Sequence, residues 1–144
     1  MPRGLTLPEL LCVLAIVGVL TATAVRPLAR TLDRIAVDEA VDRYAALHET
    51  TRQLAMARAG LARLEIDTAA RSVTMSWRTI AGVWDTAGTR PLGQARVWAS
   101  QTAVTFTPLG YGWGFSNATL VLSRGAIAET LTVSRTGRLK RAGG

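Results

Sequence analysis

The residues of this chain that could do chemistry are few and widely spaced. There is one histidine, His48, and one cysteine, Cys12. The last 77 residues contain only two carboxylates, Asp85 and Glu129, which are 44 positions apart. A nucleophile with its base, or a set of metal ligands, needs several such groups together. We therefore expect no enzymatic activity, no metal and no cofactor, and the single cysteine excludes an internal disulfide.

One carboxylate stands out by its surroundings. Residues 5–25 carry a single formal charge, on Glu9, and are long and apolar enough to cross a bilayer as a helix. A carboxylate there is costly unless a cation neutralises it. If the chain is cut before Leu5, the new α-amine lies about 6 Å from Glu9 along the helix axis and can be that cation. A plain membrane anchor, or a secretory signal cleaved after residues 22–24, are the alternatives.

The net charge of +7 belongs to the second half of the chain. Residues 1–67 hold equal numbers of basic and acidic residues, whereas residues 68–144 hold nine basic residues and two acidic ones. This imbalance predicts a basic face on one domain. Its densest part is a cluster around one turn, formed by Arg135, Arg138, Lys140 and Arg141.

Two kinds of element must position these groups. The apolar run predicts a helix that continues from residue 5 to residue 59, stops at Gly60 and bends at Pro27. His48 lies alone on this helix, without a second ligand, and is interpreted as a surface or packing residue. The stripe expected to pack on a sheet consists of Leu28, Leu32 and Ile35, continued by Val41, Tyr44, Leu47 and Leu54.

From residue 61 the hydrophobic period changes to about two, and glycines punctuate the sequence. We expect strands over residues 62–67, 72–79, 95–99, 103–107, 118–123, 129–134 and 138–141. Short strands with tight turns predict an antiparallel sheet, and the helix must cover one of its faces. The fold class is therefore α+β. The residues expected to build the core are Trp77, Trp84, Trp98, Phe106 and Trp113.

The first residues also resemble a known family. Arg3-Gly4-Leu5-Thr6-Leu7-Pro8-Glu9, followed by a long apolar run, resembles the class III signal of type IV pilins and type II secretion pseudopilins. The resemblance implies that a prepilin peptidase cuts between Gly4 and Leu5 and methylates the new amino terminus. Glu9 then becomes the fifth mature residue. The first mature residue of the family is usually Phe, so Leu5 is a departure.

A second resemblance covers the end of the chain. Residues 106–110, 118–123 and 131–140 resemble the end of the GspH/FimT pseudopilin domain, which closes with a strand, a Gly-Arg turn and a short basic strand. Together the two resemblances imply a pilin-like organisation. Residues 1–4 are a leader, 5–25 a transmembrane and filament-core helix, 26–60 an amphipathic helix, and 61–144 a β-domain.

The resemblance implies a minor pseudopilin, or a minor pilin, that assembles with other subunits into a filament. It sits first in the bacterial inner membrane as a single-pass protein with a periplasmic C-terminal domain. In the filament Glu9 meets the Leu5 amine of a neighbour. A count of basic residues around the span implies the opposite orientation, because Arg26, Arg30 and Arg34 follow it and only Arg3 precedes it.

The alternative function is double-stranded DNA binding for natural transformation by a FimT-like minor pilin. Some DNA-binding members of the family carry a Gly-Arg-x-Arg motif near the C-terminus. Here residues 137–141 read Gly-Arg-Leu-Lys-Arg, with lysine in the last motif position. Lysine still neutralises a phosphate but lacks the bidentate fork of arginine.

Overall fold

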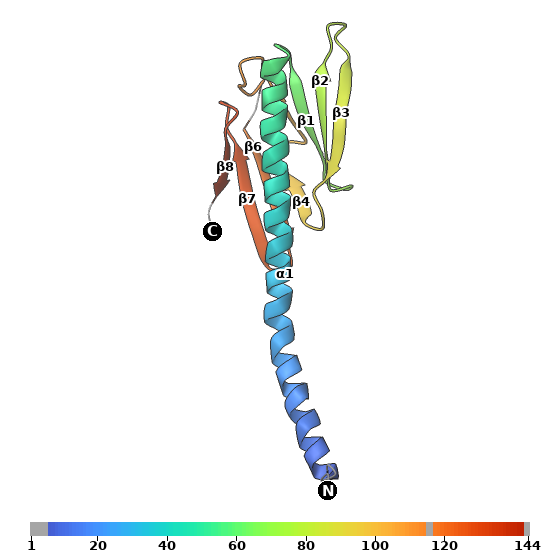
Figure 1. Ribbon diagram of the computed structural model, residues 1–144. Helices are drawn as coiled ribbons and strands as arrows, with labels where there is room; N and C mark the ends of the chain where they lie inside the picture. The colour runs from blue at the N-terminus through green and yellow to red at the C-terminus, as the bar shows by residue number, and fades with distance from the viewer. Residues whose placement is uncertain (1–5, 115–116, 143–144) are drawn as a thin grey trace. The chain divides into compact units, whose positions relative to one another are not determined.

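The computed structural model describes residues 6–114 and 117–142, which form one helix and eight strands. Residues up to Leu32 and residues from Asp33 onward are two separate units, and each is described by itself. The elements are α1 (Leu7–Ala57), β1 (Ala62–Asp67), β2 (Ser72–Arg78), β3 (Trp84–Pro91), β4 (Arg96–Ala99), β5 (Ala103–Phe106), β6 (Ala118–Arg124), β7 (Ile127–Val133) and β8 (Leu139–Ala142) (Figure 1).

The end of α1 is closed by a residue that the sequence did not single out. The amide of Gly60 donates to the carbonyl of Ala55 at 3.1 Å, and the amide of Ala59 donates to Met56 at 3.2 Å. These two bonds form a Schellman motif, whose left-handed position is usually glycine. Here that position is Ala59, with φ of 46°. The predicted helix ran to residue 59 with Gly60 as its stop, whereas α1 ends at Ala57 and its left-handed position is Ala59.

The strands form two antiparallel four-stranded sheets, with the orders β3-β2-β1-β5 and β4-β6-β7-β8. The expectation of one sheet was wrong, because β4 and β5 each pair with strands distant in the sequence. In Figure 1, β1, β2 and β3 lie to the right of the upper half of α1, β7 and β8 lie to its left, and β4 appears at its lower right. Hairpins join β1 to β2, β2 to β3, β6 to β7 and β7 to β8.

Strand β3 was absent from the sequence prediction. Its residues are mostly exposed, so no alternation of apolar and polar side chains marks it. Gly88 lies within it, and the register with β2 shifts between Met75 and Ser76, which marks a β-bulge. An edge strand with a glycine and a bulge resembles a turn at the sequence level.

Helix residues from Val37 to Ala55 form the centre of the domain core. The helix side chains that are buried follow the helical period: Val37, Ala40, Val41, Tyr44, His48, Thr51 and Ala55. They pack on aliphatic residues of both sheets, including Leu64, Val73, Leu122 and Leu131. All buried members of the two core clusters lie between residues 37 and 133. The unit that begins at Asp33 therefore carries its own core.

The predicted stripe was right in its second part and wrong in its first. Val41 and Tyr44 are buried, and Leu47 packs against the core, whereas Leu28 and Ile35 are exposed. Other helix residues are buried in the core instead, and some of them are small or polar, such as Ala40 and Thr51. The Thr51 hydroxyl donates to the carbonyl of Leu47 at 2.7 Å, so its burial leaves no unpaired group.

The prediction of a tryptophan core was also wrong. Phe106 is fully buried, but Trp98 and Trp113 are 59% and 61% exposed. Trp77 and Trp84 are half-buried beneath arginines. The guanidinium carbon of Arg58 lies 3.9 Å from the Trp77 ring centroid, and that of Arg63 lies 4.3 Å from the Trp84 ring centroid. Cation–π contacts of this kind keep an indole at the surface.

Candidate assembly helix and basic surface

The first half of α1 exposes a continuous apolar surface. Leu7, Leu14 and Val19 are 75%, 59% and 64% exposed, and their apolar neighbours are similar. By length and composition this helix can cross a membrane. The Thr21 hydroxyl is satisfied locally, since Oγ1 donates to the carbonyl of Val17 at 2.7 Å. Exposed apolar surfaces of this extent mark sites that contact other proteins or a membrane.

Glu9 has a local partner at the start of this helix. The amide of Thr6 donates to Glu9 Oε2 at 3.4 Å, and the amide of Leu10 donates to the carbonyl of Thr6 at 3.1 Å. Thr6 and Glu9 thus occupy the N-cap and N3 positions of a capping box. A glutamine at position 9 would make the same bond, so the cap alone does not require a charge. The predicted cleavage and methylation residues, Gly4 and Leu5, lie outside the described residues.

The basic turn between β7 and β8 is well ordered by its own hydrogen bonds. The amide of Ser134 donates to the carbonyl of Arg138 at 2.9 Å, and the amide of Gly137 donates back to Ser134 at 2.9 Å. The Ser134 and Thr136 hydroxyls lie 2.8 Å apart. Arg135 and Arg138 are exposed on this turn, and Lys140 is exposed on β8. The structure therefore presents these three cations to solvent.

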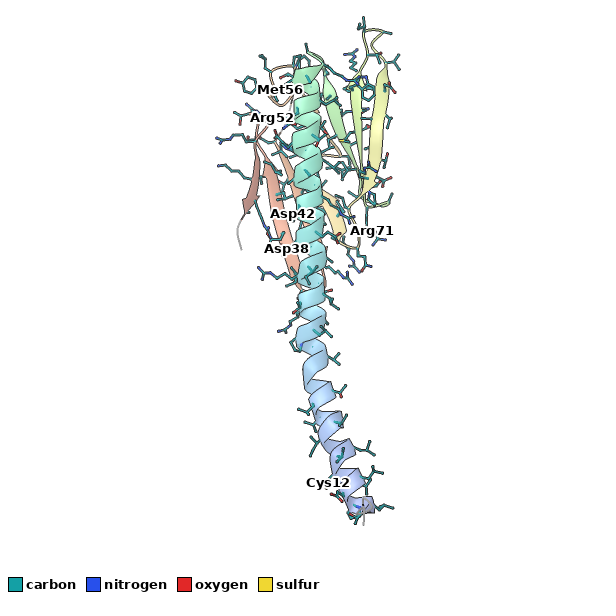
Figure 2. All side chains as sticks on the ribbon, in the orientation of Figure 1. Cys12, Asp38, Asp42, Arg52, Met56 and Arg71 are labelled. Carbon is teal, nitrogen blue, oxygen red and sulfur yellow. The ribbon has the colours of Figure 1, made fainter. Side chains whose placement is uncertain are left out.

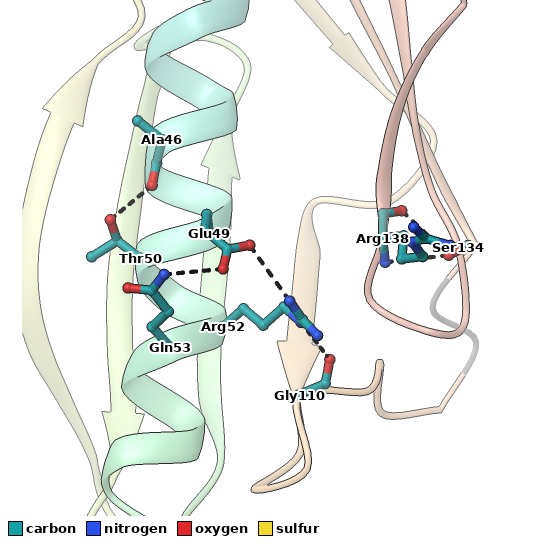
Figure 3. Close-up of polar contacts among 8 residues, drawn as sticks. All are labelled: Ala46, Glu49, Thr50, Arg52, Gln53, Gly110, Ser134 and Arg138. Carbon is teal, nitrogen blue, oxygen red and sulfur yellow. Dashed lines mark hydrogen bonds and ion pairs between the residues drawn. The ribbon is translucent and has the colours of Figure 1, made fainter.

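A chain of contacts from α1 holds the turn in place. Arg52 Nε donates to the carbonyl of Gly110 at 3.0 Å (Figure 3). Gly137 packs directly on the same carbonyl, since a Cβ built at Gly137 would lie 2.3 Å from it. Gly137 also has φ of 72°. Both conditions require glycine, so the glycine of the Gly-Arg turn has a packing role.

Arg141 differs from the other basic residues of the C-terminal cluster. It donates from Nη2 to Asp38 Oδ1 at 2.6 Å and from Nε to Glu129 Oε2 at 3.1 Å. The hydrogen bond from Arg141 lowers the pKa of Glu129, and both carboxylates raise the pKa of Arg141. Among the described residues, no carboxylate forms an ion pair with Arg135, Arg138 or Lys140. Within this cluster these three residues are therefore the unpaired cations, and Arg141 is committed to ion pairs.

Sequence reasoning missed the partners that arrange this surface. In the sequence Asp38 stands four residues after Arg34, at helical spacing, and nothing connects Arg52 with Gly110. Their contacts join residues 58 to 103 positions apart. No local spacing in the sequence signals such pairs.

His48 is a packing residue, as predicted. It is 2% exposed, and its ring lies edge-on to Phe106 with 5.0 Å between the ring centroids. Burial lowers the pKa of His48 to about 4, so the imidazole is neutral at physiological pH. Within residues 6–114 and 117–142, no cluster of His, Cys, Asp and Glu could hold a metal ion.

Comparison with known sequences found no matching family model and no curated protein that matches. Comparison with solved structures found clear similarity. The type IV minor pilin FimU of Pseudomonas aeruginosa superposes with a TM-score of 0.64 and 13% identity, over 76% of this chain and 90% of that one. The minor pseudopilin EpsH of the Vibrio cholerae type II secretion system superposes with TM-scores of 0.59 and 0.57 in two structures. The identities are 13% and 14%, over 76% and 72% of this chain and 94% and 95% of those.

These likenesses, together with the observed helix and antiparallel sheets, confirm the predicted α+β, pilin-like class. The chain has the fold shared by minor pilins and minor pseudopilins, a long N-terminal helix packed on an antiparallel β-domain.

Proposed function

We propose that this chain is a minor subunit of a type II secretion pseudopilus or a type IV pilus. The observation that carries the proposal is the exposed apolar half of α1 with Glu9 in its first turn. Pilin-like neighbours in the structure comparison support the same role. The subunit waits in the inner membrane with its β-domain in the periplasm. During assembly its apolar helix segment leaves the lipid and packs against the apolar helices of other subunits.

Glu9 sets the register of this assembly. The apolar faces supply affinity but little axial specificity, because neighbouring leucines and valines can slide past one another. A carboxylate in that environment must find a cation, and cleavage after Gly4 creates one at the amine of Leu5. The capping bond uses one oxygen of Glu9 and leaves the charge uncompensated. A neighbour's amine then has one favourable position.

The first measurement identifies the residue at which the processed chain begins. The full chain is produced with a prepilin peptidase, and the amino terminus of the product is identified by mass spectrometry. We expect N-methylated Leu5. A product that begins at Met1 would overturn the proposal, and one that begins at Val25 would show a secretory signal instead.

The second measurement is incorporation into sheared filaments. Glu9→Gln keeps the capping bond and loses the charge, so we expect it to be processed but poorly incorporated. Glu9→Asp keeps the charge and is the matched control. Equal incorporation of wild type and Glu9→Gln would overturn the register role.

Three exposed cations favour a second candidate function, the binding of double-stranded DNA. Arg135, Arg138 and Lys140 have no described carboxylate partner and lie on one ordered turn and its following strand. Cations held this way neutralise backbone phosphates without reading the sequence. Binding of this kind weakens steeply as the salt concentration rises.

Residues 28–144 contain the whole core and suit a direct DNA-binding test. Duplex DNA is titrated at two salt concentrations with wild type, Arg138→Gln/Lys140→Gln, and Arg71→Gln/Arg96→Gln as a control of equal charge. We expect only the first variant to lose affinity and to show a smaller salt slope. No binding at low salt, or equal loss in both variants, removes this candidate.

A further inference from the structure

A second group of arginines forms a polar pocket away from the basic turn. The pocket has a volume of about 410 Å³ and is lined by Arg71, Gln94, Arg96, Ser123, Arg124 and Gly125. These residues come from the β1–β2 turn, from β4 and the segment before it, and from the end of β6 with its turn. Every polar side chain among them can donate a hydrogen bond, and none is acidic. We call it the Arg71 pocket.

The backbone holds this pocket together. Arg71 has φ of 52°, and its carbonyl accepts a hydrogen bond of 2.8 Å from the amide of Leu92. That bond places the β1–β2 turn beside the segment that leads into β4. Arg96 lies directly opposite Ser123 in the β4–β6 ladder. The donors converge because strands from both sheets end at the same place.

Only one of the three guanidinium groups is neutralised. Arg124 Nε lies 3.0 Å from Asp33 Oδ1. Gly125 packs on the same carboxylate, since a Cβ built there would lie 2.2 Å from Asp33 Oδ2. In the described part of the chain, Arg71 and Arg96 have no carboxylate partner, and both are exposed. Two uncompensated guanidinium groups beside an amide and a hydroxyl suit a phosphate, whose oxygens accept several such bonds.

The pocket lies at the end of the domain where α1 enters it. Figure 2 shows Arg71 level with Asp38 and Asp42, far along the helix from Arg52 and Met56. The basic turn is at the other end, because Arg52 and Gly110 hold it there. Asp33, the partner of Arg124, is eight residues after Val25, where the apolar segment ends. Eight residues span at most about 28 Å, so lipid head groups are within reach of the pocket.

We propose that the Arg71 pocket binds the phosphate of an anionic phospholipid head group while the subunit is anchored in the membrane. This proposal rests on the proposed function, in which residues 5–25 lie in the bilayer. The contact holds the β-domain on the membrane surface until assembly withdraws the helix. Binding is electrostatic, so it weakens with salt and needs anionic lipid.

Residues 28–144 lack the apolar segment, so their binding to vesicles does not depend on insertion or processing. Vesicles of phosphatidylcholine, with and without phosphatidylglycerol, are floated with this domain. Arg71→Gln/Arg96→Gln is compared with Arg138→Gln/Lys140→Gln, which removes the same charge from the basic turn. We expect binding only to the anionic vesicles, a loss of roughly tenfold or more in the first variant, and little change in the second. Thermal melts check that both variants fold.

A second arm separates lipid from free phosphate and from nucleic acid. Glycerol phosphate is titrated while the amide resonances of Ser123 and Gly125 are followed by NMR, and we expect shifts that disappear in Arg71→Gln/Arg96→Gln. Amide shifts without vesicle binding would overturn the lipid assignment. An equal loss of vesicle binding in the two variants would overturn the pocket as a binding site, because it would show that the net positive charge of the domain attracts the vesicles. A loss of DNA binding in Arg71→Gln/Arg96→Gln, with vesicle binding unchanged, would reassign the pocket to nucleic acid.

Discussion

Arg141 and Asp38 are 103 positions apart, and Arg141 Nη2 donates to Asp38 Oδ1 at 2.6 Å. The same guanidinium also contacts Glu129, so one side chain of β8 joins the neighbouring strand β7 to α1. Strand β8 is the edge of its sheet and pairs only with β7. The ion pairs therefore secure an edge strand to the helix.

Removal of this guanidinium should loosen β8. In Arg141→Gln we expect severalfold faster amide hydrogen exchange at residues 139–142, because the strand loses its ion pairs and keeps only its ladder bonds and the packing of Leu139. Arg138→Gln is the control, since no described carboxylate pairs with Arg138. Hydrogen exchange detected by NMR measures the effect. Equal exchange rates in the two variants would contradict the role of Arg141.

The Arg141 contact with Glu129 also responds to acid. The hydrogen bond lowers the pKa of Glu129 from 4.5, so its contribution is fully present above about pH 4.5. It is lost as the pH falls through the lowered pKa of the folded state. The exchange difference between wild type and Arg141→Gln should therefore shrink at acidic pH.

Buried His48 should make the domain sensitive to mild acid. Its pKa is about 4 in the fold and 6.5 as an unperturbed side chain, so the unfolded chain binds the proton first. The contribution of neutral His48 to the free energy of unfolding is fully present above pH 6.5. It falls as the pH drops from 6.5 towards 4, by about 3 kcal/mol in total. Burial is the largest cause of the lowered pKa, and Glu49 and Arg52 act on His48 in opposite directions.

Denaturant unfolding of residues 28–144 at a series of pH values measures this dependence. In His48→Leu we expect the free energy of unfolding to lose this dependence on pH between pH 6.5 and about 5. A slope that persists unchanged in His48→Leu would show that another group is responsible.

The left-handed residue that ends α1 offers a stabilising substitution. Ala59 has φ of 46°, a conformation that costs an L-residue about 1 kcal/mol relative to glycine. Ala59→Gly should therefore raise the free energy of unfolding by about 1 kcal/mol. Ala57→Gly, in the last helical residue, is the control and should lower it by up to about 1 kcal/mol. Chemical denaturation of the domain compares them, and a destabilised Ala59→Gly would exclude the Schellman cap as described.

Alanine substitutions at Gly137 and Gly114 distinguish the cost of backbone strain from the cost of a steric clash. Both have positive φ, of 72° and 74°. A Cβ at Gly114 meets nothing within 4 Å, whereas at Gly137 it would lie 2.3 Å from the carbonyl oxygen of Gly110. Gly114→Ala should cost about 1 kcal/mol from strain alone. Gly137→Ala should cost clearly more and displace the basic turn, which NMR shifts of Arg135 and Arg138 would report.

Local signals in the sequence were enough to predict most elements. The change of hydrophobic period near residue 61 separated the helix from the strands, and β1 was predicted with its observed bounds, Ala62–Asp67. The apolar run with Glu9 predicted the membrane-length helix. These features depend on neighbouring residues, whose spacing matches a helix or a strand directly.

Contacts between distant residues decided the rest. The division into two sheets depends on how β4 and β5 pair across the chain. The helix buries Ala40 and Thr51, because small side chains let it approach both sheets closely. The tertiary structure also decided that Arg141 is neutralised, while Arg71 and Arg96 meet in one pocket. A charge count weighs all arginines equally, but only folding sets the distance from each guanidinium to the nearest carboxylate.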